Sequence, residues 1–356
     1  MRPIKAMAYR KAHRLAISGA LEAISLAARL KIVATQKHRG VIFTLHHVCA
    51  DRPDRFQPNA HLSITPQFLD RVLATVRRNG WKPVRLDQMP DLLSRGDNDD
   101  RYAVFTLDDG YRNNRSEALP VFRKHEVPFT VFVTSGFMRR SRSIWWMTLE
   151  EILRSRRSIT FGGGAPMKTE STFEKYAAFD RVCRYLESTG ENQFVDDLDD
   201  HARAIGVDPM SIVEREVLSS EDVAAFSNDP LVSIGAHTVN HLNLAKLESK
   251  LAAREMSASA DDIGALTGRR PTLFAYPYGR RGAACEREFE IAAQCGFDVA
   301  VTTRPGMIET PDGVNMLSLP RISLNGYFQK SRYIEALLTG LPFRFASALG
   351  QNVGNG

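Results

Sequence analysis

Short apolar runs of strand length alternate along the chain with longer segments whose apolar residues recur at helical spacing. Strands that alternate with helices predict an α/β protein with a mostly parallel sheet or barrel. The predicted strands are Val41–Leu45, Pro83–Leu86, Ala103–Leu107, Phe129–Val133, Val232–Ala236, Leu273–Ala275, Val299–Thr302 and Met316–Leu319. The predicted helices include Thr65–Asn79, Glu117–His125, Ser220–Ser227, Lys246–Thr267 and Glu286–Cys295.

The same pattern divides the chain into one main domain with additions. Residues 37–340 carry the alternating strands and helices. Within them, residues 139–229 show no strand pattern and predict a largely helical insertion between two strands. The polar residues near the end of segment 341–356 predict a C-terminal tail.

Residues 1–36 predict a basic amphipathic helix, because Lys, Arg and Ala are interleaved with apolar residues at helical spacing. Glu22 and Arg29 interrupt any continuous apolar run, which argues against a membrane span and against a clear signal peptide. Such a helix either packs on its own domain or makes peripheral contact with an anionic membrane. We therefore expect a protein that is cytoplasmic or associated with the cell envelope.

Composition narrows the classes that remain. A chain of 356 residues with 43% hydrophobic residues is long enough for one α/β barrel with insertions. The net charge is +6, but the basic residues are spread along the chain, and no zinc-finger spacing or aromatic-basic module is present. We therefore expect no nucleic-acid partner. The four cysteines form no CxxC pair and predict free thiols, and the sequence leaves the oligomeric state open.

Two short motifs carry the candidate chemistry. Asp108 and Asp109 follow a predicted strand directly, and His237 and His241 follow another. In a helical turn, residues four apart share a face, so both histidines can point at one ion. Two histidines and one carboxylate are a common ligand set for catalytic zinc, and the second carboxylate is then free to act as a base. This pattern predicts a metal hydrolase.

Polar and aromatic residues also follow other predicted strands. In a β/α barrel, the carboxyl ends of the strands build the active site. The residues at or just beyond these ends are His46, His47, Asp108, Asp109, His237, Tyr276, Tyr278 and Arg321. We expect them to meet at one rim of the barrel.

These motifs resemble those of the polysaccharide deacetylases (the NodB-homology domain, carbohydrate esterase family 4), which remove acetyl groups from N-acetylglucosamine-containing glycans. The resemblance runs from about Val41 to Ser323. The family motif TFDDG corresponds to Thr106–Gly110, H-[ST]-x-x-H to His237–His241, and F-R-x-P-Y-G to Phe274–Gly279. It implies a distorted (β/α)7-8 barrel of the NodB-homology type with a helical insertion.

The resemblance also implies roles for individual residues. Asp109, His237 and His241 would bind the metal, typically Zn²⁺, although other divalent transition metals also suit such ligands. Asp108 would be the general base that takes a proton from metal-bound water. The backbone N–H of Tyr278 would face the developing oxyanion.

The chain departs from the family pattern at two positions. The arginine that usually orients the base is Ala275 here, and Arg321 is the candidate replacement. The late Leu-x-His of the family is missing, because no histidine follows His241. A first-strand histidine can occupy the same place in a closed barrel, which makes His46 the expected acid, with His47 facing the opposite way.

Aromatic residues complete the expected site. Tyr276, Tyr278, Trp145 and Trp146 are candidates for binding sugar rings, although the two tryptophans could equally anchor the insertion to the barrel. The expected activity is metal-dependent N-deacetylation of an N-acetylglucosamine-containing polysaccharide or oligosaccharide. The alternatives are a hydrolase of another non-peptide C–N bond on the same scaffold, a catalytically silent glycan-binding module, and a membrane-surface protein that depends on residues 1–36 alone.

Overall fold

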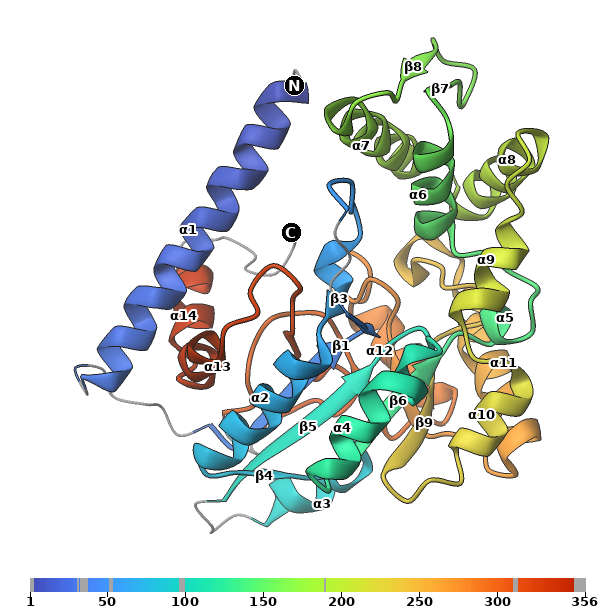
Figure 1. Ribbon diagram of the computed structural model, residues 1–356. Helices are drawn as coiled ribbons and strands as arrows, with labels where there is room; N and C mark the ends of the chain where they lie inside the picture. The colour runs from blue at the N-terminus through green and yellow to red at the C-terminus, as the bar shows by residue number, and fades with distance from the viewer. Residues whose placement is uncertain are drawn as a thin grey trace.

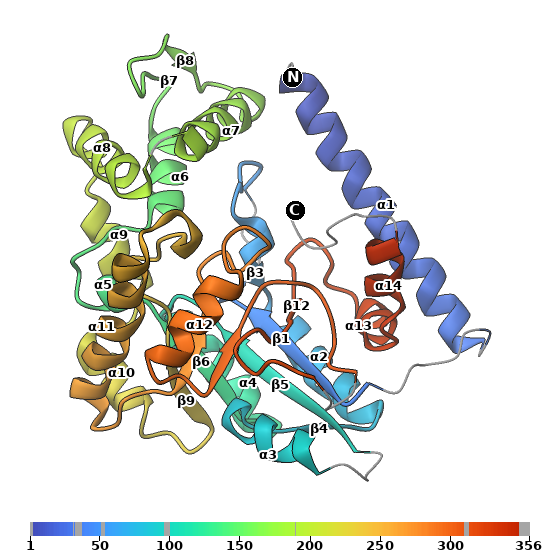
Figure 2. The same ribbon diagram turned by 180° about the vertical axis from the view of Figure 1, so that it is seen from behind.

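The computed structural model describes residues 3–30, 32, 38–50, 54–95, 100–188, 190–309 and 313–348. Seven parallel strands form the central sheet, in the order β11-β10-β9-β6-β5-β1-β12 (Figures 1 and 2). Their bounds are β1 Gly40–Leu45, β5 Arg101–Leu107, β6 Phe129–Val133, β9 Val232–Ala236, β10 Leu273–Ala275, β11 Val299–Val301 and β12 Ile322–Ser323. A further short strand, β4 (Trp81–Pro83), pairs with the beginning of β5.

The sheet curls until its two edges nearly meet. Strand β12 pairs with β1, and Leu319 forms a single parallel bridge to Val301 at the end of β11. The segment 319–323 therefore crosses from one edge of the sheet to the other. This arrangement confirms the predicted α/β class and the distorted barrel.

Two predicted strands were misplaced. Within Met316–Leu319, only Leu319 pairs, and the strand that adjoins β1 begins at Ile322. Pro320 lies between them and has no N–H to donate to a ladder. The strand predicted at Pro83–Leu86 lies earlier, at Trp81–Pro83, because the chain enters a 3-10 turn at Leu86–Gln88.

Seven helices of the described chain accompany the barrel strands. They are α2 Pro66–Arg78, α3 Met89–Ser94, α4 Leu119–Lys124, α5 Ser135–Met138, α10 Ser220–Phe226, α11 Ser249–Thr267 and α12 Glu286–Gln294. Helix α2 begins as its sequence predicts, because the Thr65 hydroxyl accepts a hydrogen bond from the Phe68 N–H at 3.2 Å and Pro66 opens the helix. Its apolar side packs on the sheet, in the same core as the stacked rings of Phe43 and Phe105.

The insertion folds around a small core of its own. It contains α6 (Trp145–Ser155), α7 (Thr172–Ser188), α8 (Glu191–Ala204) and α9 (Pro209–Glu216). It is mainly helical, but it also holds a hairpin that the sequence pattern did not indicate, β7 (Ser158–Ile159) with β8 (Met167–Lys168). A second small sheet, directly after β1, pairs β2 (His47–Val48) with β3 (Ser63–Ile64).

The two ends of the described chain lie side by side, outside the barrel. Helix α1 (Pro3–Arg29) packs against α13 (Ser331–Leu338) and α14 (Leu341–Ala348), as Figures 1 and 2 show. Residues 341–348 of the expected tail are thus helical, whereas 349–356 lie outside the described residues, as do 31 and 33–37.

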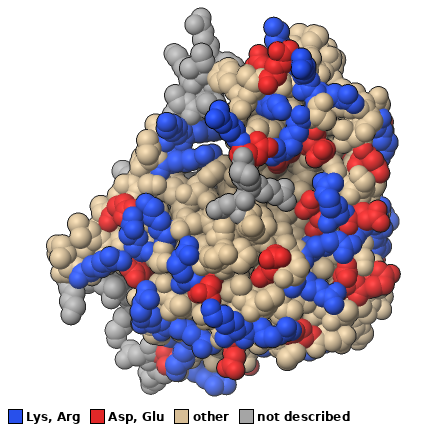
Figure 3. Space-filling model, viewed as in Figure 1, with Lys and Arg blue, Asp and Glu red and all other residues tan. Residues whose placement is uncertain are grey.

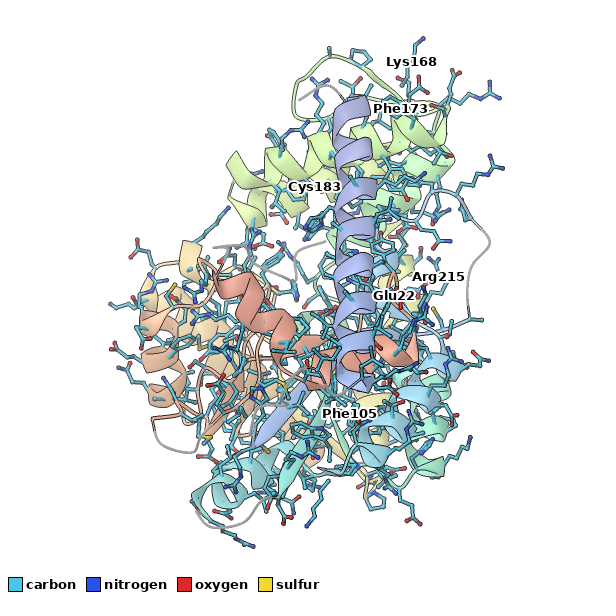
Figure 4. The ribbon with its side chains drawn as sticks, turned by 90° about the vertical axis from the view of Figure 1, so that its left-hand side faces the viewer. Glu22, Phe105, Lys168, Phe173, Cys183 and Arg215 are labelled. Carbon is cyan, nitrogen blue, oxygen red and sulfur yellow. The ribbon has the colours of Figure 1, made fainter. Side chains whose placement is uncertain are left out.

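Polar contacts hold α1 in place. Glu22, labelled in Figure 4, accepts hydrogen bonds from Arg332 and from the Tyr333 hydroxyl, the latter at 2.9 Å. Ion pairs join Arg29 to Glu335 at 3.0 Å and Arg10 to Asp180 on α7. Helix α1 therefore connects the C-terminal helices with the insertion.

Lys and Arg side chains form several separate groups on the face shown in Figure 3, with Asp and Glu among them. This distribution agrees with the spread of basic residues along the chain. Among the described helices, none is long and apolar enough to cross a membrane.

Candidate active site

The two adjacent carboxylates lie where β5 ends. The backbone N–H of Asp108 still donates to Leu45 of β1 at 2.9 Å, and the chain then turns sharply, with φ of 72° at Asp109 and 71° at Gly110. Asp109 adopts the left-handed conformation that Asp tolerates better than most residues. This turn points both carboxylates into the barrel mouth, where each is almost completely buried.

The two histidines lie on a tight loop after β9 and not on a helix. Thr238 and His241 have φ of 64° and 55°, and the Thr238 hydroxyl accepts a hydrogen bond from the His241 N–H at 2.9 Å. The buried carboxylate of Glu255 on α11 accepts from the backbone N–H groups of Val239 and Asn240 at 3.1 and 2.8 Å. The predicted convergence of the histidines is found, but the helical turn expected to produce it is absent.

Asp109, His237 and His241 converge on one point. The Oδ1 atom of Asp109 lies 3.5 Å from Nε2 of His237 and 3.4 Å from Nε2 of His241. One ligand atom from each residue lies within 4.8 Å of the others. Asp109 Oδ1 is buried and has no hydrogen-bond partner among the described residues. A buried oxygen without a donor, facing two imidazole nitrogens, fits a divalent cation.

Neighbouring groups orient these ligands. His237 Nδ1 lies 2.7 Å from the carbonyl oxygen of Ala275, so we assign the proton to Nδ1, which leaves Nε2 free toward Asp109. The hydroxyl of Tyr111 is hydrogen-bonded to the Asp109 carboxylate. Burial and the adjacent charge of Asp108 raise the pKa of Asp109 to about 8. A bound cation would offset this unfavourable ionisation and lower the pKa again.

Asp108 forms a buried ion pair with Arg321. Nη1 and Nη2 of Arg321 donate to Oδ1 and Oδ2 of Asp108, each at 2.7 Å, in a bidentate pair. Arg321 also donates to the Thr302 carbonyl oxygen at 2.8 Å and to the Thr106 hydroxyl at 3.0 Å. Burial alone would raise the pKa of Asp108, but the Arg321 guanidinium holds it well below its usual range. Arg321 therefore lies where the missing motif arginine was expected to act.

His46 and His47 point in different directions at the end of β1. His46 lines the same cavity as Asp108 and His237. Burial lowers the pKa of His46 to about 4, although the negative charge of Asp108 partly opposes this shift. His47 instead stacks on Tyr111 with ring centroids 3.5 Å apart, and its Nδ1 lies 2.9 Å from Asn113 Nδ2.

Tyr278 presents its backbone to the cavity in a strained turn. Its φ is 60°, and its N–H has no acceptor among the described residues. Gly279 follows with φ of 54°, and a Cβ atom there would lie 2.5 Å from the Thr303 backbone nitrogen. Glycine is therefore required to bring the chain this close to its neighbour.

The aromatic candidates divide into two pairs by their contacts. The Tyr278 hydroxyl donates to Glu191 and accepts from Trp145 Nε1 at 3.3 Å, next to the His241 ring. The Tyr276 hydroxyl donates to the Leu317 carbonyl oxygen at 2.9 Å, and Trp146 Nε1 donates to the Tyr111 hydroxyl at 3.2 Å. All four side chains form hydrogen bonds within the protein, but Tyr276 and Trp146 are buried, whereas Trp145 and Tyr278 are partly exposed.

One cavity of about 540 Å³ is lined by all the candidate residues except His47. They are His46, Asp108, Asp109, Trp145, Trp146, His237, His241, Tyr276, Tyr278 and Arg321. The structure therefore brings together residues that are separated by as many as 275 positions in the sequence, from His46 to Arg321.

Three residues of the site were not anticipated from the sequence. They are Tyr111, which touches Asp109; Glu191, which holds Tyr278 and the Asn243 N–H; and Glu255, which shapes the histidine loop. Tyr111 follows the DDG motif directly and could have been suspected on that ground. The two glutamates carry no local signal, because they lie on helices outside the motifs, Glu191 on α8 and Glu255 on α11.

The polysaccharide deacetylase family model matches residues 95–161 and 191–300. The matched segments contain Asp108, Asp109, His237 and His241. The chain belongs to this family. YxkH of Bacillus subtilis (strain 168), a polysaccharide deacetylase by name, is 30% identical over 92 residues, which are 26% of this chain and 32% of YxkH.

Solved deacetylase structures have a similar fold. The Streptococcus pyogenes deacetylase PplD, in complex with acetate, aligns with a TM-score of 0.51 and 20% identity over 84% of this chain and 96% of PplD. IcaB from Ammonifex degensii aligns with a TM-score of 0.53 and 16% identity over 86% of this chain and all (100%) of IcaB. At these identities the likeness shows the fold alone.

Proposed function

We propose that the protein is a metal-dependent N-deacetylase that releases acetate from N-acetylglucosamine-containing glycans. The observation that carries this proposal is the Asp109–His237–His241 cluster beside the Asp108–Arg321 pair in a single cavity. Family membership supports the reaction class, and the orphaned Asp109 oxygen supports the cation. We assign the metal as Zn²⁺, to which imidazole and carboxylate ligands are suited.

The chain's own residues have distinct tasks in this proposal. A bound zinc ion would polarise the amide carbonyl and lower the pKa of water. Asp108, kept ionised by Arg321, accepts the proton from the attacking water. The unpaired N–H of Tyr278 donates to the oxyanion that develops on the acetyl group.

His46 returns a proton to the departing amine. Its pKa of about 4 makes the ring neutral at pH 7, so the ring must first take up the proton that Asp108 accepts from the attacking water. The negative charge of Asp108 raises the pKa of His46 and so favours transfer of the proton to it. Arg321 is a positioning residue, because it acts through Asp108.

The sugar ring is proposed to lie against Trp145 and Tyr278. Their polar atoms are joined to each other and to Glu191, so both aromatic faces are held in fixed positions. Tyr276 and Trp146 contribute to the cavity wall, since both side chains are buried, whereas Trp145 and Tyr278 are partly exposed.

The proposal includes peripheral membrane contact through α1. Leu15 and Leu26 on α1, and Leu30 just beyond its end, are 65%, 59% and 60% exposed. Lys11 and Arg29, both exposed, are basic residues near these leucines. Exposed apolar residues with basic neighbours are the pattern of a helix that lies on an anionic membrane surface.

Acetate release from N-acetylglucosamine oligomers tests the activity. The purified protein is assayed as isolated, after chelation, and after zinc is added back. We expect release that chelation abolishes and zinc restores. The absence of release from protein that holds stoichiometric metal would refute the proposed reaction while leaving the metal site in place.

A further inference from the structure

The active-site cavity extends beyond the barrel into a region of different chemistry. We call this region the apolar lobe and define it by Ile17, Leu21, Phe68, Ile334, Leu337 and Phe343, all of which line the same cavity as Asp108 and His237. Residues of α1, α2, α13 and α14 form its walls. Figure 4 shows α1 lying along this side of the molecule.

The lobe is poorly suited to sugar rings. Among the described residues, Asp108 and Asp109 are the only carboxylates that line the cavity, and both belong to the catalytic end. A saccharide placed among aliphatic side chains would leave its hydroxyl groups without hydrogen bonds, which is costly. A hydrocarbon chain has no such groups, and each buried methylene strengthens binding by roughly fourfold.

The side chain of Arg14 provides a positive charge in the same cavity as the apolar lobe. The rings of His61 and Tyr327 are 6.4 Å apart, and the Arg14 guanidinium lies 3.4 Å from the centre of the Tyr327 ring. Arg14, His61 and Tyr327 line the same cavity as His46.

Arg14 packs on Tyr327 in the cavity wall but is not neutralised by a carboxylate among the described residues. Ile17 and Leu21 follow Arg14 along the same face of α1, so the lobe begins directly beyond the cation. A ligand that enters this way would meet the charge before the aliphatic walls.

We propose that the substrate is an N-acetylated amino sugar joined through a phosphate to a hydrocarbon chain. The sugar lies at the catalytic end, the phosphate at Arg14 and the chain in the apolar lobe. This inference rests on the proposed deacetylase function and names its substrate class. A substrate of this kind resides in a membrane, which agrees with the proposed membrane contact through the exposed apolar residues of α1.

A series of alkyl N-acetyl-β-glucosaminides tests the chain site. Methyl, butyl, octyl and dodecyl glycosides are assayed for acetate release by the zinc-loaded protein, below the concentrations at which they aggregate. We expect kcat/KM to rise at least tenfold from methyl to dodecyl. Equal kcat/KM across the series would overturn the chain site while leaving the deacetylase intact.

Filling the lobe should remove this preference. Leu337→Trp places a large ring in the lobe, and Ile17→Trp does so from the opposite wall in case the first variant folds poorly. The dodecyl-to-methyl ratio of kcat/KM should fall close to one in both. Leu251→Trp, at an exposed leucine on α11 that does not line the cavity, is the matched control and should keep the wild-type ratio.

The phosphate site has a separate test. Arg14→Gln should lower kcat/KM at least tenfold more for N-acetylglucosaminyl dodecyl phosphate than for the uncharged dodecyl glycoside. Equal losses on the two would overturn the phosphate assignment.

Binding separates failure of this inference from failure of the proposed reaction. Titration calorimetry with the same glycosides measures chain-dependent affinity whether or not acetate is released. Affinity that rises with chain length without any acetate release would support the lobe and refute deacetylation. If neither affinity nor turnover changes with chain length, the lobe does not bind the hydrocarbon chain.

Discussion

The two ends of the cavity are built in opposite ways. The catalytic end consists of buried charged groups at the ends of β5, β9 and the segment before β12, each held by specific hydrogen bonds. The apolar lobe consists of aliphatic and aromatic side chains from α1, α2, α13 and α14, most of which lie outside the barrel. The barrel therefore supplies the reacting groups, whereas the terminal helices shape the other end of the cavity.

This difference should appear in how each end tolerates change. A buried ion pair such as Asp108–Arg321 is sensitive to the loss of either partner, because the remaining charge is left buried and unpaired. Apolar walls accept residues of similar volume at little cost. Substitutions at the two ends therefore provide a direct test of the comparison.

The largest effect is expected for Asp108→Asn. The amide cannot take a proton from water, so kcat should fall by about 10²–10⁴, the usual contribution of general acid–base catalysis. Zinc content, measured by elemental analysis, should stay stoichiometric, because Asp109 and the two histidines are untouched. His237→Ala is the informative contrast, since it should lose both metal and activity. Normal turnover in Asp108→Asn would exclude it as the base.

Arg321→Met should destabilise the protein and change its pH profile. It leaves the buried Asp108 unpaired, at a cost of about 3–5 kcal/mol in the free energy of unfolding. Because Arg321 keeps the pKa of Asp108 low, its removal raises that pKa, and activity should be lost at a higher pH as the solution is acidified.

The control for Arg321 is Arg112→Gln. Arg112 pairs with Asp222 at 2.7 Å on the surface, where an ion pair contributes about 0–1 kcal/mol. Chemical denaturation measures stability, and kcat/KM against pH measures the profile. An unchanged acid limb in Arg321→Met would show that Arg321 does not set the ionisation of Asp108.

His46→Gln should have an intermediate effect, confined to turnover. We expect kcat to fall by roughly 10²-fold, since proton donation to the amine is impaired while the metal ligands remain. Substrates with better leaving amines should lose less activity than N-acetylglucosamine oligomers. His47→Gln is the neighbouring control, because His47 stacks on Tyr111 and does not line the cavity. Equal losses in the two variants would argue against His46 as the acid.

The smallest effect on the enzyme itself is expected from the outer face of α1. Leu26→Asp combined with Leu30→Asp should change stability by no more than about 0.5 kcal/mol for each site, since both side chains are exposed. Binding to anionic liposomes, measured by cosedimentation, should fall at least tenfold, while acetate release from soluble oligomers stays the same. Unchanged liposome binding would refute membrane contact through this face.

Local sequence predicted much of the fold and of the site. The strands Phe129–Val133, Val232–Ala236 and Leu273–Ala275 have the bounds expected from their apolar runs. The two motifs also identified the residues that converge in the cavity. His237 and His241 converge as predicted, but a loop that contains left-handed residues brings them together, instead of the helical turn expected from their spacing.

Other parts of the site had no local signal. Glu191 and Glu255 act through long-range hydrogen bonds, to Tyr278 from the insertion and to the histidine loop from α11. Such contacts depend on how whole helices pack, and no spacing along the chain encodes them. The same holds for the strand β12, which is only two residues long and is defined by its pairing with β1.

The α/β class and the motif residues follow from the sequence alone, and the resemblance to the deacetylases implied substitutes for the arginine replaced by Ala275 and for the missing late histidine. Periodicity and residue chemistry are local properties, so they can be read without coordinates. Three features appear only in the folded protein: Arg321 pairs with Asp108, His46 and His47 separate, and α1 joins the C-terminal helices to extend the cavity. These outcomes depend on barrel curvature and on the packing of distant segments, which side-chain patterns alone do not specify.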